Sequence, residues 1–116
     1  MKVYVYYNLH RKTWSIKALE GPDKGRVIAH RDQLSLGTVS FKVSEAGRQR
    51  VLREQRKNVH AGACGDWFDT DDGYYSDWQR VSYNPYRAGT FVDADTGAPV
   101  HAANYAAFRD NNVFIY

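Results

Sequence analysis

Short segments that are rich in β-branched and aromatic residues and alternate with a period of two recur along this chain. The first covers residues 3–7, a second covers 14–19, and a third covers 38–43. Alternation with a period of two places successive side chains on opposite faces of a β-strand. Residues 21–25 contain two glycines, a proline and an aspartate, which are residues typical of turns. The pattern therefore predicts a mainly antiparallel sheet built from hairpins.

Further strand-like segments lie in both halves of the chain. They cover residues 26–30, 78–83, 90–92, 98–100 and 113–116. Residues 93–97 are expected to form a hairpin turn that uses Asp95 and Gly97. Residues 102–108 are rich in alanine, and their pattern is compatible with either a helix or a strand.

The periodicity changes at Ser44, which is a favourable N-cap residue. Glu45 then places a carboxylate in the first turn, where the helix dipole favours it. We expect a helix over residues 45–60 that is ended by Gly62. A narrow apolar stripe would pack on the sheet, and a basic surface would lie on the opposite side. That basic surface consists of Arg50, Arg53, Arg56 and Lys57.

The chain of 116 residues has the length of one domain, and its hydrophobic share of 43% is sufficient for a modest core. The expected fold is a single α+β domain over residues 1–116, with a mainly antiparallel sheet of hairpins packed against one central basic helix. Residues 62–80 are expected to be a loop rich in aspartate and glycine. Its spacing differs from a calcium-binding loop, because Arg80 stands where a bidentate glutamate is required.

Charge is distributed unevenly along the chain. Residues 1–60 carry 13 lysines and arginines against five acidic residues, whereas residues 61–116 carry three arginines against eight aspartates. This asymmetry indicates either a basic surface for an anionic partner or two halves that neutralise each other. In the second case, the arginines would be paired with the aspartates that follow them, and no anion site would remain.

The residues that commonly support catalysis are scattered. Cys64 is the single cysteine, which excludes an internal disulfide and a cysteine metal cluster within one chain. The four histidines show no metal-binding spacing on the expected helix. Residues 21–25 lack the spacing and the Lys-Ser/Thr end of a phosphate-binding loop, and Asp93 and Asp95 fall in an expected turn. We therefore expect no enzyme activity, no metal and no cofactor.

No apolar run approaches the length of a membrane-spanning helix, and residues 1–9 alternate instead of forming a signal-peptide core. We expect no membrane partner and a reducing cytoplasmic environment. A homo-oligomer is compatible with the sequence.

Recognition of an anion is the remaining possibility. Arginine binds phosphate with a planar fork of donors, and the 15% aromatic content offers rings on which bases stack. The predicted ligand-binding residues are Arg50, Arg53, Arg56 and Lys57 for phosphate, with Trp78, Tyr83 and Tyr86 for stacking. The alternatives are a solvated helix face and aromatic residues that merely populate strands.

Residues 1–12, 53–62, 83–86 and 90–94 together resemble small, functionally uncharacterised proteins of tailed bacteriophages. The resemblance implies a phage accessory protein that acts in the host cytoplasm, and it assigns no site residue. The leading hypothesis is a protein that binds an anionic nucleotide-type small molecule and counteracts a host defence by sequestering a nucleotide signal. The alternatives are a regulator that binds DNA or RNA and a direct inhibitor of a host protein that uses the acidic loop.

Overall fold

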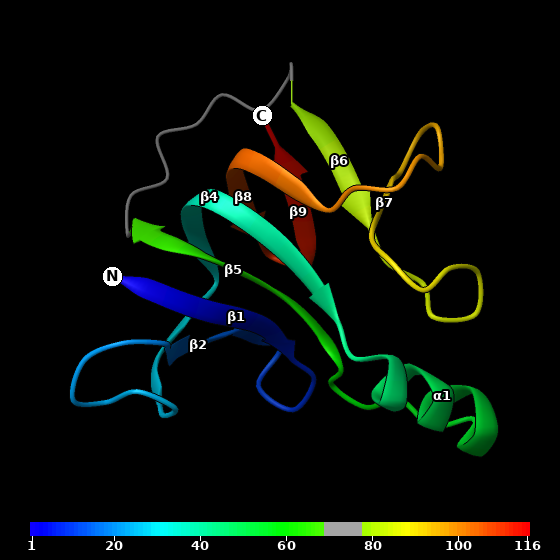
Figure 1. Cartoon of the computed structure of the whole chain (residues 1–116), viewed down its shortest axis with the longest axis horizontal. Helices are drawn as coiled ribbons and strands as arrows, with labels where there is room; N and C mark the ends of the chain where they lie inside the picture. The colour runs from blue at the N-terminus through cyan, green and yellow to red at the C-terminus, as the bar shows by residue number, and fades with distance from the viewer. Residues whose placement is uncertain (69–77) are drawn as a thin grey trace.

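The computed structural model describes residues 1–68 and 78–116, which form a curved antiparallel sheet and one short helix (Figure 1). In chain order the elements are β1 (Lys2–Asn8), β2 (Thr13–Ala18), β3 (Val27–Arg31), β4 (Gln33–Val43), α1 (Glu45–Glu54), β5 (Ala61–Phe68), β6 (Gln79–Ser82), β7 (Val92–Asp93), β8 (Ala102–Arg109) and β9 (Asn112–Ile115). Within the described ranges, the order across the sheet is β3-β2-β1-β5-β4-β8-β9-β6-β7.

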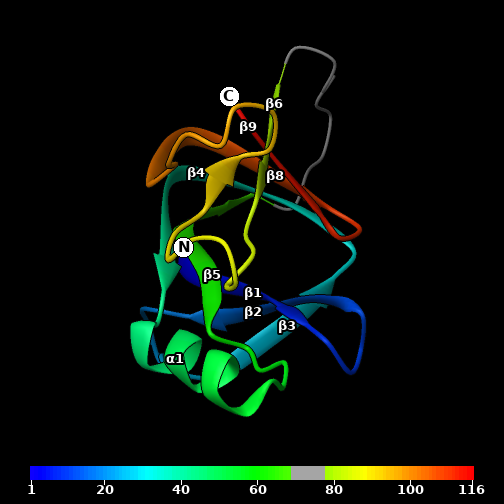
Figure 2. The same ribbon diagram turned by 90° about the vertical axis from the view of Figure 1, so that its right-hand side faces the viewer.

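The sheet curls until its two arms face each other across the core (Figure 2). Three strands separate β2 from β8 in the strand order. Nevertheless, the ring centroids of Trp14 on β2 and Phe108 on β8 lie 4.8 Å apart in an edge-on arrangement. The indole nitrogen of Trp14 also donates a hydrogen bond of 2.7 Å to the carbonyl oxygen of Asp110. These contacts join the β1–β3 arm to the β8–β9 arm.

The long strand β4 connects the arms, because it pairs with β5 on one side and with β8 on the other. Its register with β5 shifts between Gly37 and Ser40. At this irregularity Thr38 has a φ of 50°, a left-handed conformation that is uncommon for a β-branched residue. A β-bulge bends its strand and increases the local twist, so this feature contributes to the curl.

The expected packing of the sheet against a central helix is wrong, and the protein is largely β. Helix α1 has ten residues, and Val51 is its buried residue. It lies beyond the end of β4 and does not cover a face of the sheet (Figure 1). The core is instead closed by the sheet itself, with fully buried side chains from several strands. They include Val3, Val5, Ile16, Leu34, Leu36 and Phe108.

The helix is shorter than the expected range of 45–60. It ends at Glu54, and Gln55 adopts a left-handed conformation while its N–H bonds to the carbonyl of Val51. The chain then turns back and passes against the first turn of the helix at Gly47. A Cβ atom on Gly47 would lie 2.5 Å from Cβ of His60, so a glycine is required for this close approach.

The expected loop over 62–80 is wrong in its first part, because β5 occupies Ala61–Phe68 in the middle of the sheet. The glycines of β5 reflect close packing. A Cβ on Gly62 would lie 2.3 Å from the carbonyl oxygen of Val5, and a Cβ on Gly65 would lie 2.8 Å from that of Gly37. Glycine within a strand often marks such an approach. The remainder of the acidic stretch, residues 69–77, lies outside the described residues.

The other strands agree with the alternation pattern. Expected strands at 3–7, 14–19, 26–30, 38–43, 78–83 and 113–116 correspond to β1, β2, β3, β4, β6 and β9. The ambiguous segment 102–108 is strand β8. The turn at 93–97 forms, but its flanking strands are reduced to the two residues of β7 and a bridge between Val92 and Pro99.

Candidate ligand-binding site

A hollow of about 490 Å³ lies between the segment that follows α1 and the turn that follows β6. We call it the Tyr83 hollow. Its wall contains Tyr7, Leu9, Val51, Lys57, Asn58, Val59, His60, Ala61, Tyr83, Asn84, Pro85, Tyr86 and Asn111. The wall therefore combines aromatic rings, amide side chains and one lysine, which is a composition suited to a ligand with a flat ring and a negative charge.

A second cavity of about 400 Å³ adjoins the Tyr83 hollow and extends toward the core. The two share Tyr7, Ala61, Tyr83 and Asn111. Arg80, a basic residue of β6, is among the residues that line the inner cavity. The combined cleft thus has a basic residue in each of its parts.

A row of rings connects the core to the hollow. The centroids of Phe41 and Phe91 lie 4.9 Å apart, and those of Phe91 and Tyr83 lie 5.2 Å apart. The imidazole of His60 continues the row, edge-on to Tyr83 at 5.3 Å. Offset and edge-on arrangements of this kind are favourable for aromatic pairs and hold each ring in a defined orientation.

The protonation of His60 follows from its neighbours. Its Nδ1 lies 3.0 Å from the backbone carbonyl oxygen of Asn58, an acceptor that requires a donor. In the neutral imidazole Nδ1 therefore carries the proton, and Nε2 is left as an acceptor. Nε2 lies 2.6 Å from the hydroxyl oxygen of Tyr83. With this tautomer the hydroxyl of Tyr83 donates a hydrogen bond to Nε2 of His60, which orients the phenol ring in the wall.

Burial raises the pKa of Tyr83, and the charge of Glu45 acts in the same direction, whereas the charge of Arg48 lowers it. The phenol thus stays neutral at physiological pH. Because its single O–H is used by His60, Tyr83 presents its ring to a ligand, and the neutral phenol is not a base. The geometry therefore supports ligand binding and provides no activated nucleophile at this position.

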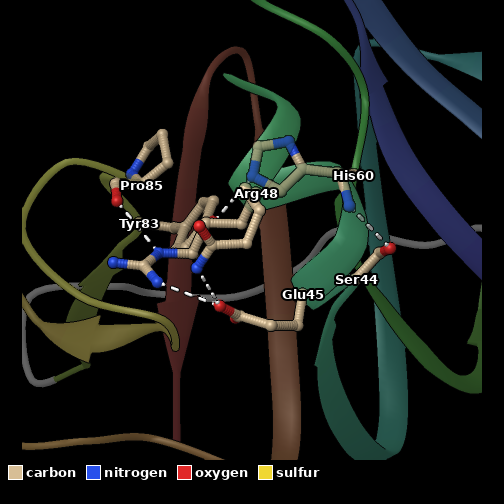
Figure 3. A network of polar contacts seen from close by, with 8 residues as sticks. Ser44, Glu45, Arg48, His60, Tyr83 and Pro85 are labelled. Carbon is tan, nitrogen blue, oxygen red and sulfur yellow. Dashed lines mark hydrogen bonds and ion pairs between the residues drawn. The ribbon is translucent and has the colours of Figure 1, made fainter. Parts of the chain in front are cut away.

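Arg48 of α1 contacts the turn after β6 that carries Pro85, a residue in the wall of the hollow (Figure 3). Its Nε donates a hydrogen bond of 3.0 Å to the carbonyl oxygen of Pro85, and its terminal nitrogen lies 3.2 Å from the Glu45 carboxylate. A hydrogen bond from Gln49 is the main cause of the lowered pKa of Glu45, and Arg48 adds to it. Arg48 is thus a positioning residue that holds the wall in place.

The turn after β6 presents Tyr86 at the rim. The side-chain oxygen of Asn84 accepts a hydrogen bond of 3.0 Å from the backbone N–H of Tyr86, and its backbone oxygen accepts one of 3.0 Å from Arg87. Such Asx turns fix the path of the backbone. The Tyr86 side chain is 55% exposed and can contact a ligand without displacing protein atoms.

The structure brings three of the predicted residues together in this hollow, namely Lys57, Tyr83 and Tyr86. Arg50 lies outside its wall and pairs with Glu54 of the same helix at 3.1 Å. Arg53 and Arg56 are exposed and also lie outside the wall. Trp78 packs against Tyr116 with centroids 5.5 Å apart, before the start of β6, whereas Tyr83 follows its end.

Residues missed at the sequence level include Asn58, His60, Arg80 and Asn111. These reach the cleft through long-range strand pairing and loop closure, for which no local pattern gives a signal. Cys64 is the single cysteine of the chain, and burial is the main cause of its raised pKa. A thiol with a raised pKa is a poor nucleophile. The predicted inhibitor surface on the acidic loop falls largely on residues 69–77, outside the described residues.

Comparison with known proteins identifies the family. The family model described as the Mycobacterium phage L5 gene 82 protein matches residues 1–116. The chain belongs to this family. The gene 82 protein of Mycobacterium phage L5 is 40% identical over 119 residues, covering 97% of this chain and 94% of that protein. No solved structure matches the chain.

Membership of the L5 gene 82 family confirms the predicted resemblance to small bacteriophage proteins. The match spans every residue of the Tyr83 hollow and both arms of the sheet. Among the described residues, no helix has the length and apolar character required to cross a membrane. Location in the host cytoplasm remains a prediction.

Proposed function

We propose that this phage protein is a non-enzymatic accessory protein that binds an anionic ligand of the nucleotide type. The observation that carries the proposal is the convergence of Lys57, Tyr83 and Tyr86 on one hollow of about 490 Å³. These residues lie on two segments that are far apart in sequence, and the fold brings their side chains to a common space.

The chemistry of the hollow matches the two parts of a nucleotide. Aromatic side chains offer faces on which a base stacks, at about 1 to 3 kcal/mol for each base. Lys57 supplies a point charge for phosphate, and Arg80 in the inner cavity supplies a planar fork of donors. The amides of Asn58 and Asn111 can donate to and accept from the edge of a base.

The exposed arginines of α1 have a different role in this proposal. Arg53 and Arg56 lie in the basic half of the chain, and their positive potential raises the local concentration of an anion near the hollow. Arg50 contributes less to this potential because Glu54 neutralises it. Binding without turnover is the behaviour that a protein needs in order to sequester a nucleotide signal of a host defence.

A thermal-shift screen of linear and cyclic mononucleotides tests the proposal. A ligand of the right class should raise the unfolding temperature in a saturable manner, since a ligand at 100 times its Kd stabilises the native state by about 2.7 kcal/mol. The substitution Lys57→Gln should lower the affinity for the ligand about tenfold, and Tyr86→Ala should lower it by about fivefold or more.

Lys24→Gln is the matched control for charge. Lys24 is exposed and lies on the turn between β2 and β3, away from the wall of the hollow. Its removal lowers the net charge by the same amount and should leave the affinity within about twofold. An absence of any shift across the screen, or an equal loss in Lys24→Gln and Lys57→Gln, contradicts a specific site at this hollow.

A further inference from the structure

The outer face of β1 and β2 carries a second group of aromatic and basic residues. We propose that it is a second subsite, so that the ligand is a short single-stranded nucleic acid that contacts both this face and the Tyr83 hollow. This inference rests on the proposed function and extends it from a mononucleotide to a polymer.

The two rings of the subsite point away from the core. Val3 and Val5 are fully buried, and strand alternation therefore places Tyr4 and Tyr6 on the other face of β1. Their ring centroids lie 6.1 Å apart with planes inclined by 34°. The Tyr4 ring leans across β5, because a Cβ on Gly62 would lie 2.6 Å from its Cζ.

Together with basic side chains, these rings surround a hollow of about 510 Å³. Lys17 is paired directly opposite Tyr4 in the β1–β2 ladder, and Lys57 and His10 also line the hollow. Within the described part of the chain, no ion pair is recorded for Lys17 or Lys57. Their charges are therefore available to an anion.

The position of Lys57 connects this subsite with the first one. Lys57, Asn58 and Val59 line both hollows, so the two spaces lie on either side of one stretch of chain. A single nucleotide fills only one of them. A single-stranded nucleic acid that crosses this stretch of chain would place one base near Tyr4 and Tyr6 and another near Tyr83 and Tyr86. One of its phosphates would then lie near Lys57.

The remaining charges on this face agree with a polyanion. Lys42 on β4 is paired with Gly62, the residue across which Tyr4 leans, and it adds a cation to this face of the sheet. Asp66 on β5 adds an acidic group to this face, and it is paired in register with Lys2. Sheet faces with stacked aromatic residues and surrounding lysines are a common means of holding single-stranded nucleic acid.

Fluorescence anisotropy with a labelled single-stranded oligonucleotide of about ten nucleotides tests the inference, beside the mononucleotide screen. The oligonucleotide should bind at least about tenfold more tightly than a mononucleotide of the same base. Tyr6→Leu and Lys17→Gln should each lower the affinity for the oligonucleotide by about fivefold or more. Lys17→Gln should also make the plot of log affinity against log salt concentration less steep, by the contribution of about one phosphate contact.

Tyr105→Leu and Lys24→Gln are the controls, because Tyr105 is 52% exposed and lines a different hollow, and Lys24 lies on the β2–β3 turn. Oligonucleotide affinity that is insensitive to Tyr6→Leu and Lys17→Gln overturns the second subsite. Mononucleotide binding without the expected gain for the oligonucleotide also overturns it and leaves the proposed function intact. Oligonucleotide binding that depends on Tyr6 and Lys17 but not on Lys57 or Tyr86 overturns contact with both sites and contradicts the Tyr83 hollow.

Discussion

At the scale of single residues, Asp93 shows how one carboxylate organises a turn. Its Oδ1 accepts hydrogen bonds from the backbone N–H groups of Asp95 at 2.8 Å and of Thr96 at 3.0 Å. Its Oδ2 accepts a hydrogen bond of 3.0 Å from the side-chain amide of Gln79. The bond from Thr96 is the largest cause of its lowered pKa, followed by that from Asp95. The charged form is therefore favoured in the folded protein relative to the unfolded chain.

This gives a pH dependence with a definite sign. A lowered pKa in the folded state stabilises the protein above the usual pKa of 3.8, and the stabilisation is lost as the pH falls through the folded value. Asp93→Asn keeps an acceptor oxygen but removes the charge. We expect its free energy of unfolding to fall less steeply than that of the wild type between about pH 5 and pH 2. Urea unfolding monitored by circular dichroism at several pH values measures this slope.

Asp95→Asn is the control, since Asp95 lies in the same turn and its side chain takes part in none of the hydrogen bonds described for that turn. It should retain the acid dependence of the wild type. An acid slope in Asp93→Asn that equals the slope of the wild type would show that these bonds do not favour the charged form.

At the scale of elements, the sequence predicts strands well where alternation and burial agree. In β1 the apolar residues Val3 and Val5 are both fully buried, as period-two alternation predicts. The pattern fails at β5, whose glycines resemble those of a loop. They are required because neighbouring backbone and a tyrosine ring pass close to the strand. Such contacts depend on residues about 30 to 60 positions away, and no local window contains them.

The expected end of the helix at residue 60 is wrong for a related reason, since α1 ends at Glu54. Propensity favours continuation through residues 56–60, but pairing draws the chain back toward β4, where the N–H of Ser44 bonds to the carbonyl of His60 at 2.7 Å. Tertiary pairing thus overrides helix propensity. The same reversal of the chain after α1 places Lys57 and His60 in the wall of the Tyr83 hollow. A helix continued to residue 60 does not predict this position for either residue.

The close packing of β5 makes Gly62→Ala a direct test. A Cβ at this position would lie 2.3 Å from the carbonyl oxygen of Val5 and 2.6 Å from Cζ of Tyr4. The backbone cannot yield without breaking the β1–β5 pairing, so we expect a loss of about 1 to 3 kcal/mol in the free energy of unfolding. Chemical denaturation of the purified variant measures the loss.

Gly89→Ala is the comparison for this substitution. A Cβ there would meet its nearest atom, a carboxylate oxygen of Glu45, at an ordinary 3.5 Å. Its stability should remain within about 0.5 kcal/mol of the wild type. Equal stabilities of the two variants would mean that β5 does not lie as close to β1 as the structure shows.

At the scale of the whole molecule, the two arms of the sheet enclose one core. A sheet whose strand order runs from β3 to β7 closes its interior by curling, and the Trp14–Phe108 contact lies where the arms meet. The aromatic row Phe41–Phe91–Tyr83 extends from this core to the candidate site. Site geometry is therefore coupled to closure of the sheet, because Trp14 and Phe108 also line the inner cavity.

Phe108→Leu tests this coupling with little change in volume. The substitution removes the edge-on ring contact with Trp14, and we expect a loss of about 1 to 2 kcal/mol in the free energy of unfolding. Because the arms share a core, far-ultraviolet circular dichroism and tryptophan fluorescence should still give coincident transitions in the variant. Tyr105→Leu lies on the same strand but is 52% exposed, and it should change stability by less than about 0.5 kcal/mol. Two separated transitions in Phe108→Leu would show that each arm of the sheet folds alone. The cleft would then lie between two independently folding units and would not depend on one shared core.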